Sequence, residues 1–204
     1  MTQTAFILLT YRELPAFGPG GYARFLVEED NPFFNSIPGI ARYENWKVSK
    51  SLGTLPAPGF EWFDLLWLDA PTGLDSVWFN AELTAFRRGW VARWGYGGLP
   101  GGVNAAGYLF QGPAGGPPPL SSRLALAAGG AALIPPSGAS GWQLDSVLPK
   151  HYAWPEGEAP QPWRQPPDAA ALGASRLWMG DMALPETLPD GADFALSAER
   201  IAPA

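Results

Sequence analysis

Residues 25–48 constrain the fold of this chain more than any other stretch. The segment begins as an acidic amphipathic run, breaks at Ile37-Pro38-Gly39, and continues as a strand in which large and polar side chains alternate. A helix that stops at a sharp break and leads into a strand is the first half of a split βαβ unit. The sequence therefore predicts a fold that mixes helices and strands in one domain.

Two helices and four strands alternate in the first half of the chain. The strands are predicted at residues 4–14, 40–51, 61–69 and 103–111, and the helices at residues 22–29 and from 75 to about 94. Runs of β-rich or alternating side chains indicate the strands, and apolar residues at helical spacing indicate the helices. The order β-α-β-β-α-β predicts a ferredoxin-like α+β domain.

The composition changes after residue 111. Of the 23 prolines, 15 lie beyond this point, and proline disrupts long helices. Short strands are expected at residues 123–127, 131–134 and 141–147. We expect a ferredoxin-like domain over residues 1–111 and a Pro/Gly-rich C-terminal arm over residues 112–204, which packs on the first domain or on a partner subunit because its large aromatic residues are costly to expose.

Composition excludes several classes of function. The chain has no Cys, which rules out disulfides and thiolate sites. With a single His, His151, a metal site built from protein ligands is not expected. A net charge of −6 argues against a nucleic-acid partner. The N-terminal apolar run is short and has no basic flank, so we expect no signal peptide, no membrane span and a cytoplasmic protein.

Three motifs resemble the dimeric α+β barrel superfamily, and within it the EthD-like branch. They are Tyr11-Arg12, Phe25-Leu26-x-x-Glu29-Asp30-x-Pro32-Phe33, and Ile37-Pro38-Gly39-Ile40-x-Arg42-Tyr43, within about residues 4–111. The resemblance implies a homodimer of ferredoxin-like subunits whose open sheet faces pack together and enclose a cavity in each half. Where such families commonly have the histidine of an E-x-H-x-P-L pattern, this chain has Asp30.

Alternation along three predicted strands indicates which side chains would line that cavity. If Tyr11 and Glu13 face the cavity, Tyr43 with Asn45 and Trp62 with Asp64 are their natural companions. This set offers aromatic faces, two phenols and two carboxylates. Such groups suit an aromatic substrate.

Asp64 lies in the apolar sequence EWFDLLWLD. An unpaired carboxylate is costly to bury, so Asp64 either pairs with an arginine such as Arg12 or Arg42, or has a raised pKa and serves as a general acid or base. The two arginines could instead each hold a substrate carboxylate or phenolate, or form ion pairs at the surface.

Asp30 and His151 are further candidates for proton transfer. Asp30 lies either at a solvated helix end or, by its position in the resembling motif, in a catalytic site. His151 is the only imidazole and is suited to acid/base work near neutral pH, although it could equally lie on an exposed loop. If the C-terminal arm folds over the barrel mouth, His151 and Tyr152 would form part of a lid.

These observations predict a homodimeric enzyme, independent of cofactors and metals, that acts on a hydrophobic, aromatic small molecule by proton transfer. The reaction would be that of a lyase, decarboxylase or isomerase. One alternative is a non-catalytic protein that binds an aromatic ligand or has a structural role. Another is a cofactor-free monooxygenase, an activity that the resemblance implies for some relatives.

Overall fold

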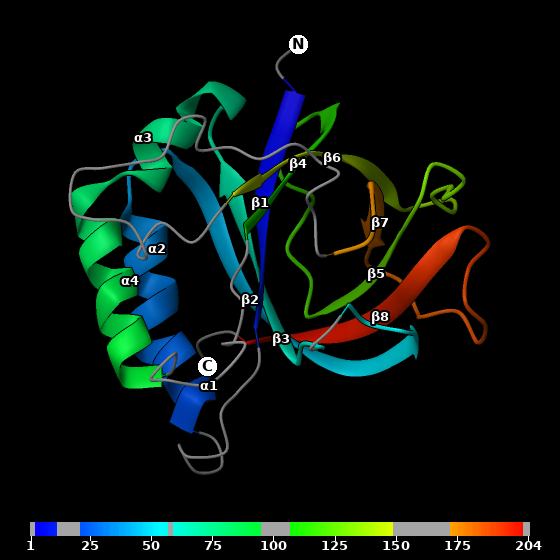
Figure 1. Ribbon diagram of the computed structural model, residues 1–204, viewed down its shortest axis with the longest axis horizontal. Coiled ribbons are helices and arrows are strands. Elements are labelled where there is room, and N and C mark those ends of the chain that lie inside the picture. Colours follow the sequence, from blue (N-terminus) through cyan, green and yellow to red (C-terminus); the bar gives the residue numbers. More distant parts are fainter. Residues whose placement is uncertain (1–2, 12–20, 57–58, 95–106, 149–171, 202–204) are drawn as a thin grey trace.

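The computed structural model describes residues 3–11, 21–56, 59–94, 107–148 and 172–201. These residues form one closed antiparallel barrel of eight strands, with helices along one side (Figure 1). The strands are β1 (Gln3–Tyr11), β2 (Ile40–Gly53), β3 (Trp62–Leu68), β4 (Gly107–Ala114), β5 (Arg123–Gly129), β6 (Ser140–Leu148), β7 (Arg176–Gly180) and β8 (Ala192–Ile201). Around the barrel they follow the order β1-β3-β2-β8-β5-β7-β6-β4.

The described helices lie in two connections of the first half. Between β1 and β2 the chain forms α1 (Gly21–Phe25), the π-helical segment η2 (Leu26–Asp30) and α2 (Asn31–Ser36). After β3 it forms the 3₁₀ turn η3 (Pro71–Gly73), α3 (Leu74–Trp78) and α4 (Ala81–Trp94). Figure 1 shows α1, α2 and α4 stacked on one side of the barrel.

The helix predicted from residue 75 to about residue 94 is interrupted after α3. Asn80 begins the second part by accepting a hydrogen bond on its Oδ1 from the backbone N–H of Leu83, at 3.0 Å. Asparagine is a strong N-cap because its side chain satisfies an N–H group that the first helical turn leaves free. Two helices therefore form where apolar periodicity alone indicated one.

The predicted ferredoxin-like α+β fold, with its open sheet face, is wrong. The first four strands have no free edge, because β8 pairs with β2 and β6 pairs with β4. An unpaired edge exposes a row of backbone donors and acceptors, and strands from the second half satisfy them here. The barrel thus closes within one chain, and closure requires no second subunit. The homodimer itself stays a prediction.

The second half contributes as many strands as the first. Its described prolines, apart from Pro113 in β4, stand in the connections, and the strands are short apolar runs between them. Residues 131–134, predicted as a strand, form a turn instead. The predicted domain boundary between residues 111 and 112 falls inside β4.

The two halves also repeat one arrangement. The first four strands lie in the order β4-β1-β3-β2 and the last four in the order β8-β5-β7-β6, which is the same order when each half is numbered from its own first strand. Within the described residues only the first half has helices in its connections. The outer face of the second half is covered by the turns that follow β5 and β7.

Large side chains fill the barrel interior. Phe6 is one of the buried interior residues. Its ring centroid lies 4.8 Å from that of Trp67, 5.4 Å from that of Phe110 and 5.0 Å from that of Trp142. An interior of eight strands is just wide enough for side chains to fill it. A second apolar layer packs between the helices and the outer face of β1, β3 and β2. No helix in the described ranges has the length and apolar character needed to cross a membrane.

Candidate functional site

A group of buried polar side chains lies between the barrel wall and the helices. Asp64 on β3 stands opposite Asn45 on β2 and Leu9 on β1. Side chains at alternate positions of a strand share a face, so Tyr11, Tyr43, Asn45 and Asp64 all point toward the helices. Strand register therefore gathers polar groups from three neighbouring strands around one carboxyl group.

Asp64 accepts three hydrogen bonds. The Tyr11 hydroxyl donates to Oδ1, the Tyr43 hydroxyl donates to Oδ2 at 2.6 Å, and Asn45 Nδ2 donates to Oδ1 at 2.8 Å. Asp64 is only 4% exposed. Three donors around a buried carboxylate partly replace the water it has lost.

Asp30 is the second carboxyl group of the cluster. It is the last residue of η2 and is 3% exposed. Asn45 Nδ2, which donates to Asp64, also donates to Asp30 Oδ2 at 2.8 Å. One amide thus bridges the two carboxyl groups. π-helical turns are rare and are found frequently at functional sites, and here the π-helical segment ends on the residue that enters the network.

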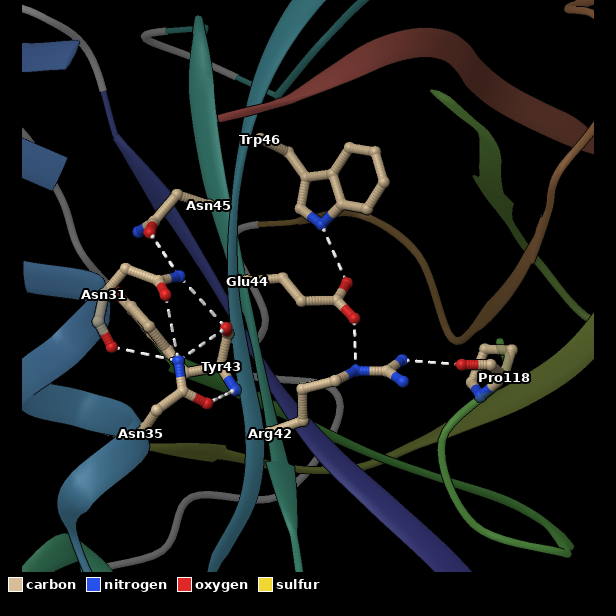
Figure 2. A network of polar contacts seen from close by, with 8 residues as sticks. All are labelled: Asn31, Asn35, Arg42, Tyr43, Glu44, Asn45, Trp46 and Pro118. Atoms are coloured by element: carbon tan, nitrogen blue, oxygen red, sulfur yellow. Dashed lines mark hydrogen bonds and ion pairs between the residues drawn. The ribbon is translucent and has the colours of Figure 1, made fainter. Parts of the chain in front are cut away.

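Two asparagines on α2 hold this bridge in place (Figure 2). Asn31 Nδ2 donates to Asn45 Oδ1 and to the Tyr43 carbonyl, both at 3.1 Å. Asn35 Oδ1 accepts from the Tyr43 backbone N–H at 2.9 Å. The side-chain oxygen Oδ1 of Asn45 accepts from Asn31. The side-chain NH₂ group of Asn45 is therefore directed at the two carboxyl groups. We call the six residues Asp30, Asn31, Tyr11, Tyr43, Asn45 and Asp64 the carboxylate network.

Burial governs the charge of this network. It raises the pKa of Asp64 to about 7, although the hydrogen bonds from Tyr11, Tyr43 and Asn45 oppose the rise. Burial, and then the charge of Asp64, raise the pKa of Asp30 well above its usual value. Burial therefore favours the protonated form of Asp30, and Asp64, with a pKa of about 7, is partly ionised near neutral pH.

The network contains no cation to offset these charges. In the described ranges, neither carboxyl group forms an ion pair with an arginine or lysine. Burial also raises the pKa values of Tyr11 and Tyr43, and the nearby carboxylates raise them further. Both phenols remain protonated and act as donors. The arrangement thus joins a carboxyl group of near-neutral pKa to a second carboxyl group of raised pKa through Asn45, and carboxyl groups with such pKa values are suited to acid/base chemistry.

Aromatic rings enclose the Tyr11 side of the network. The Tyr22 ring lies edge-on to Tyr11 and Trp62, with centroid distances of 5.7 Å and 5.4 Å. The Trp90 indole N–H donates to the Tyr22 hydroxyl at 3.2 Å. These rings exclude water and thereby account for the desolvation that raises the carboxyl pKa values.

Comparison with models of known protein families, with curated proteins and with solved structures gives no match to this chain. The resemblance to the EthD-like branch therefore stays a prediction. The carboxylate network has to be interpreted from its own geometry.

The structure brings together six of the residues proposed from the sequence. They are Asp30, Tyr11, Tyr43, Asn45, Trp62 and Asp64. They lie under the helices, however, and not on a bare sheet face, because the face without helices is the barrel interior. Arg42 points to that interior and pairs with Glu44, not with Asp64. The remaining candidates lie outside the described residues: Arg12, Glu13, His151 and Tyr152.

Sequence reasoning missed several polar residues. Asn31 and Asn35 were not singled out, although Asn31 lies directly beside Asp30 in the sequence. Arg200 was missed because β8 was not predicted as a strand. Glu44 falls on the same alternating face of β2 as Arg42 and Trp46, which is the signal that could have found it.

A cavity of about 530 Å³ lies elsewhere, on the second half of the barrel. Its lining includes Gln111, Trp142, Gln143, Asp145 and Arg176, and none of these residues belongs to the carboxylate network. In the part of the chain that the structure describes, no group of three or more His, Cys, Asp or Glu side chains is placed to hold a metal ion.

Proposed function

We propose that the protein is a cofactor-independent enzyme that transfers protons to and from a small hydrophobic molecule at the carboxylate network. One observation carries this proposal: Asp64 and Asp30 are buried together, share the amide of Asn45, and have no cationic partner among the described residues. A cluster built only for stability would gain from a cation or from apolar replacements. Perturbed carboxyl groups of this kind gather at sites of acid/base chemistry.

The two carboxyl groups take different roles. Burial raises the pKa of Asp64 to about 7, and in this proposal Asp64 acts as the general base. Asp30, whose pKa is raised by burial and by the charge of Asp64, acts as the general acid. Tyr11 and Tyr43 donate to Asp64 and set its basicity, while Asn45 keeps both carboxyl groups within reach of one reacting centre. A catalytic pKa close to the working pH gives the most effective proton transfer.

The surroundings favour a hydrophobic, aromatic substrate. Tyr22 packs beside Tyr11 and also contacts Trp62 and Phe25, and such rings attract flat apolar molecules. Many lyases, decarboxylases and isomerases add or remove a proton at carbon. We propose a reaction of this group. His151 and Tyr152, which lie outside the described residues, stay candidates for a further acid/base group and a substrate contact.

The test follows proton transfer itself, so it does not require the product to be identified. The full chain is incubated in D₂O with a panel of aryl ketones, phenols and aromatic acids, and deuterium uptake at carbon is followed by NMR. We expect uptake into at least one compound, and Asp64→Asn to slow it by about 10²- to 10⁴-fold. Asp69→Asn is the matched control, because Asp69 follows the same strand but is exposed.

The roles assigned to individual residues can be tested separately from the proposal that the protein is an enzyme. If turnover survives in the double variant Asp64→Asn with His151→Ala, the assignment of roles is wrong. If no compound takes up deuterium and none gives product, the enzyme proposal itself fails.

A non-catalytic role is the second candidate, and the burial of the network favours it. Asp30 and Asp64 are 3% and 4% exposed, which suits a network that locks the helices onto the barrel. Tryptophan fluorescence quenching by an aromatic compound without any product would support a binding protein. Turnover that requires oxygen would instead support a monooxygenase.

A further inference from the structure

A second group of charges lies inside the barrel, across β2 from the carboxylate network. Arg42, Glu44 and Trp46 alternate with the network residues along β2, and Figure 2 shows them on the opposite side of the strand. Their partners on β3 are Trp67, Leu65 and Phe63, all of which belong to the interior core. Directly opposite Trp46 on β8 stands Arg200. Arg200 continues the inward-facing series that contains Leu196 and Ala198.

Glu44 contacts a neighbour through each carboxylate oxygen: Oε1 makes an ion pair but no hydrogen bond, and Oε2 accepts a hydrogen bond. It is 4% exposed and forms an ion pair with Arg42 Nε, while the Trp46 indole N–H donates to its Oε2 at 3.0 Å. Arg42 Nη2 also donates to the Pro118 carbonyl at 2.7 Å. The Arg42 guanidinium lies over the Trp67 ring, 5.5 Å from the centroid. The single negative charge of this group is therefore used by Arg42.

Arg200 is left without an ion-pair partner among the described residues. Its Nε is buried and has no hydrogen-bond partner, and no residue of the described ranges forms an ion pair with its side chain. Burial lowers the pKa of Arg42, and the charge of Arg200 lowers it further. Burial raises the pKa of Glu44, and the charge of Arg200 opposes that rise, so Arg200 acts on the pair at close range. Two cationic side chains and one anionic side chain leave a net charge of +1 at this end of the barrel interior.

We propose that this end of the barrel binds a small organic monocarboxylate, held by Arg200 together with Arg42. The planar fork of a guanidinium matches a carboxylate and can form two parallel hydrogen bonds to it. Both arginines are only partly buried, so a ligand can reach them from solvent. A monoanion neutralises the net charge of +1, whereas a dianion such as phosphate would add repulsion with Glu44. The site does not depend on the function proposed for the carboxylate network.

The probe is benzoate, titrated into the full chain by calorimetry at low salt and at about pH 8, where benzoate is a monoanion and inorganic phosphate is mainly the dianion. We expect binding with a Kd of about 1 mM or tighter, and weaker binding of inorganic phosphate. Arg200→Gln should weaken benzoate binding by roughly tenfold or more. The melting temperature should not fall, because the Arg200 side chain gives up no partner among the described residues. Arg123→Gln is the matched control, since Arg123 is an exposed arginine near the same position on the neighbouring strand β5.

A second variant tests the charge argument. Glu44→Gln raises the local charge from +1 to +2, so benzoate and phosphate should both bind more tightly than they bind the native chain. The proposal is overturned if benzoate does not bind the native chain, if Arg200→Gln binds it as the native chain does, or if Arg123→Gln weakens it equally. It is also overturned if phosphate binds the native chain as tightly as benzoate.

Discussion

Asp64 shows how much one residue depends on its immediate surroundings. A carboxyl group in an apolar strand would normally be driven to neutrality by desolvation. Three donors favour its charged form, and the result of the two opposing effects is a pKa of about 7. Neither burial nor hydrogen bonding alone would produce this value. The identity of the groups around Asp64 therefore decides its chemistry.

The first prediction concerns stability against pH. The pKa of Asp64 rises from 3.8 to about 7 on folding, so the folded chain holds this proton more tightly than the unfolded chain. The raised pKa of Asp64 contributes about 4 kcal/mol to the free energy of unfolding. This contribution is fully present below about pH 4 and is lost as the pH rises through about 7. Asp64→Asn, which cannot ionise, should remove this loss.

Urea unfolding of both chains between pH 4 and pH 8 measures the difference. The free energy of unfolding of the native chain should fall relative to that of Asp64→Asn as the pH rises. Asp69→Asn should follow the native curve, because Asp69 is exposed. Parallel curves for the native chain and Asp64→Asn would show that Asp64 titrates normally.

The second prediction isolates one donor to Asp64. Tyr43→Phe removes a hydrogen bond of 2.6 Å but keeps the ring that stacks on Phe34, with centroids 4.1 Å apart. A hydrogen bond to a charged group contributes about 1.5 to 3 kcal/mol, so the pKa of Asp64 should rise by about 1 to 2. Infrared titration of the carboxyl band measures the pKa of Asp64. Both chains carry Asp30→Asn for this measurement, so that one titrating carboxyl group is left in the network.

The matched control for this second prediction is Phe34→Leu, which disturbs the stack and keeps the donor. It should leave the pKa of Asp64 nearly unchanged. An equal rise in both variants would mean that packing, and not the phenol, sets the pKa.

At the scale of elements, the connection from α2 to β2 positions the network. α2 ends at Ser36, and the chain turns through Gly39 before β2 begins at Ile40. Gly39 has φ of +90°, a conformation that residues with a Cβ rarely adopt. A Cβ at this position would lie 2.7 Å from Val77 Cγ2 on α3. This one turn therefore sets both the start of β2 and the approach of α3.

The third prediction tests that turn. Gly39→Ala should lower the free energy of unfolding by more than about 2 kcal/mol, because it adds a clash with buried Val77 to the cost of about 1 to 2 kcal/mol for a positive φ. Gly59→Ala is the matched control: Gly59 also has a positive φ, of +84°, but its Cβ would meet nothing within 4 Å. Chemical denaturation measures both variants. Equal losses would show that the contact with Val77 carries no cost.

At the scale of the whole molecule, closure is the dominant feature. β2 and β8 bring Ser49 into hydrogen-bond contact with Ser197, 148 residues away in the sequence. The interior core draws on strands from both halves of the chain. A barrel that shares one core in this way should unfold as one unit.

The fourth prediction follows from closure. Residues 1–111 expressed alone should not fold cooperatively, because β2 and β4 lose their partners β8 and β6 and interior rings such as Phe6 and Trp67 become exposed. Circular dichroism melts and gel filtration compare the fragment with the full chain. A monomeric fragment with a cooperative melt would show that the first half is an independent domain.

Local features were predictable from the sequence. Alternation placed Tyr11, Tyr43, Asn45 and Asp64 on one face, and they do share one. The strands β1, β2 and β3 lie within or close to their predicted ranges. The proline-rich second half was misjudged, because the prolines dominate its composition while the strands between them are short. β7 and β8 were missed for this reason.

The sequence by itself determined which side chains share a face of each strand, because side chains alternate with a period of two that depends only on the local backbone. It also determined that Asp64 could not be an ordinary exposed carboxylate. The tertiary structure alone decided which strands pair, and hence that the barrel closes within the chain. It also decided that Asp30 lies beside Asp64 under the helices and that Arg200 lies near Arg42 and Glu44 in the barrel interior. Pairing between residues far apart in sequence is set by the packing of the whole core, and no local pattern encodes it.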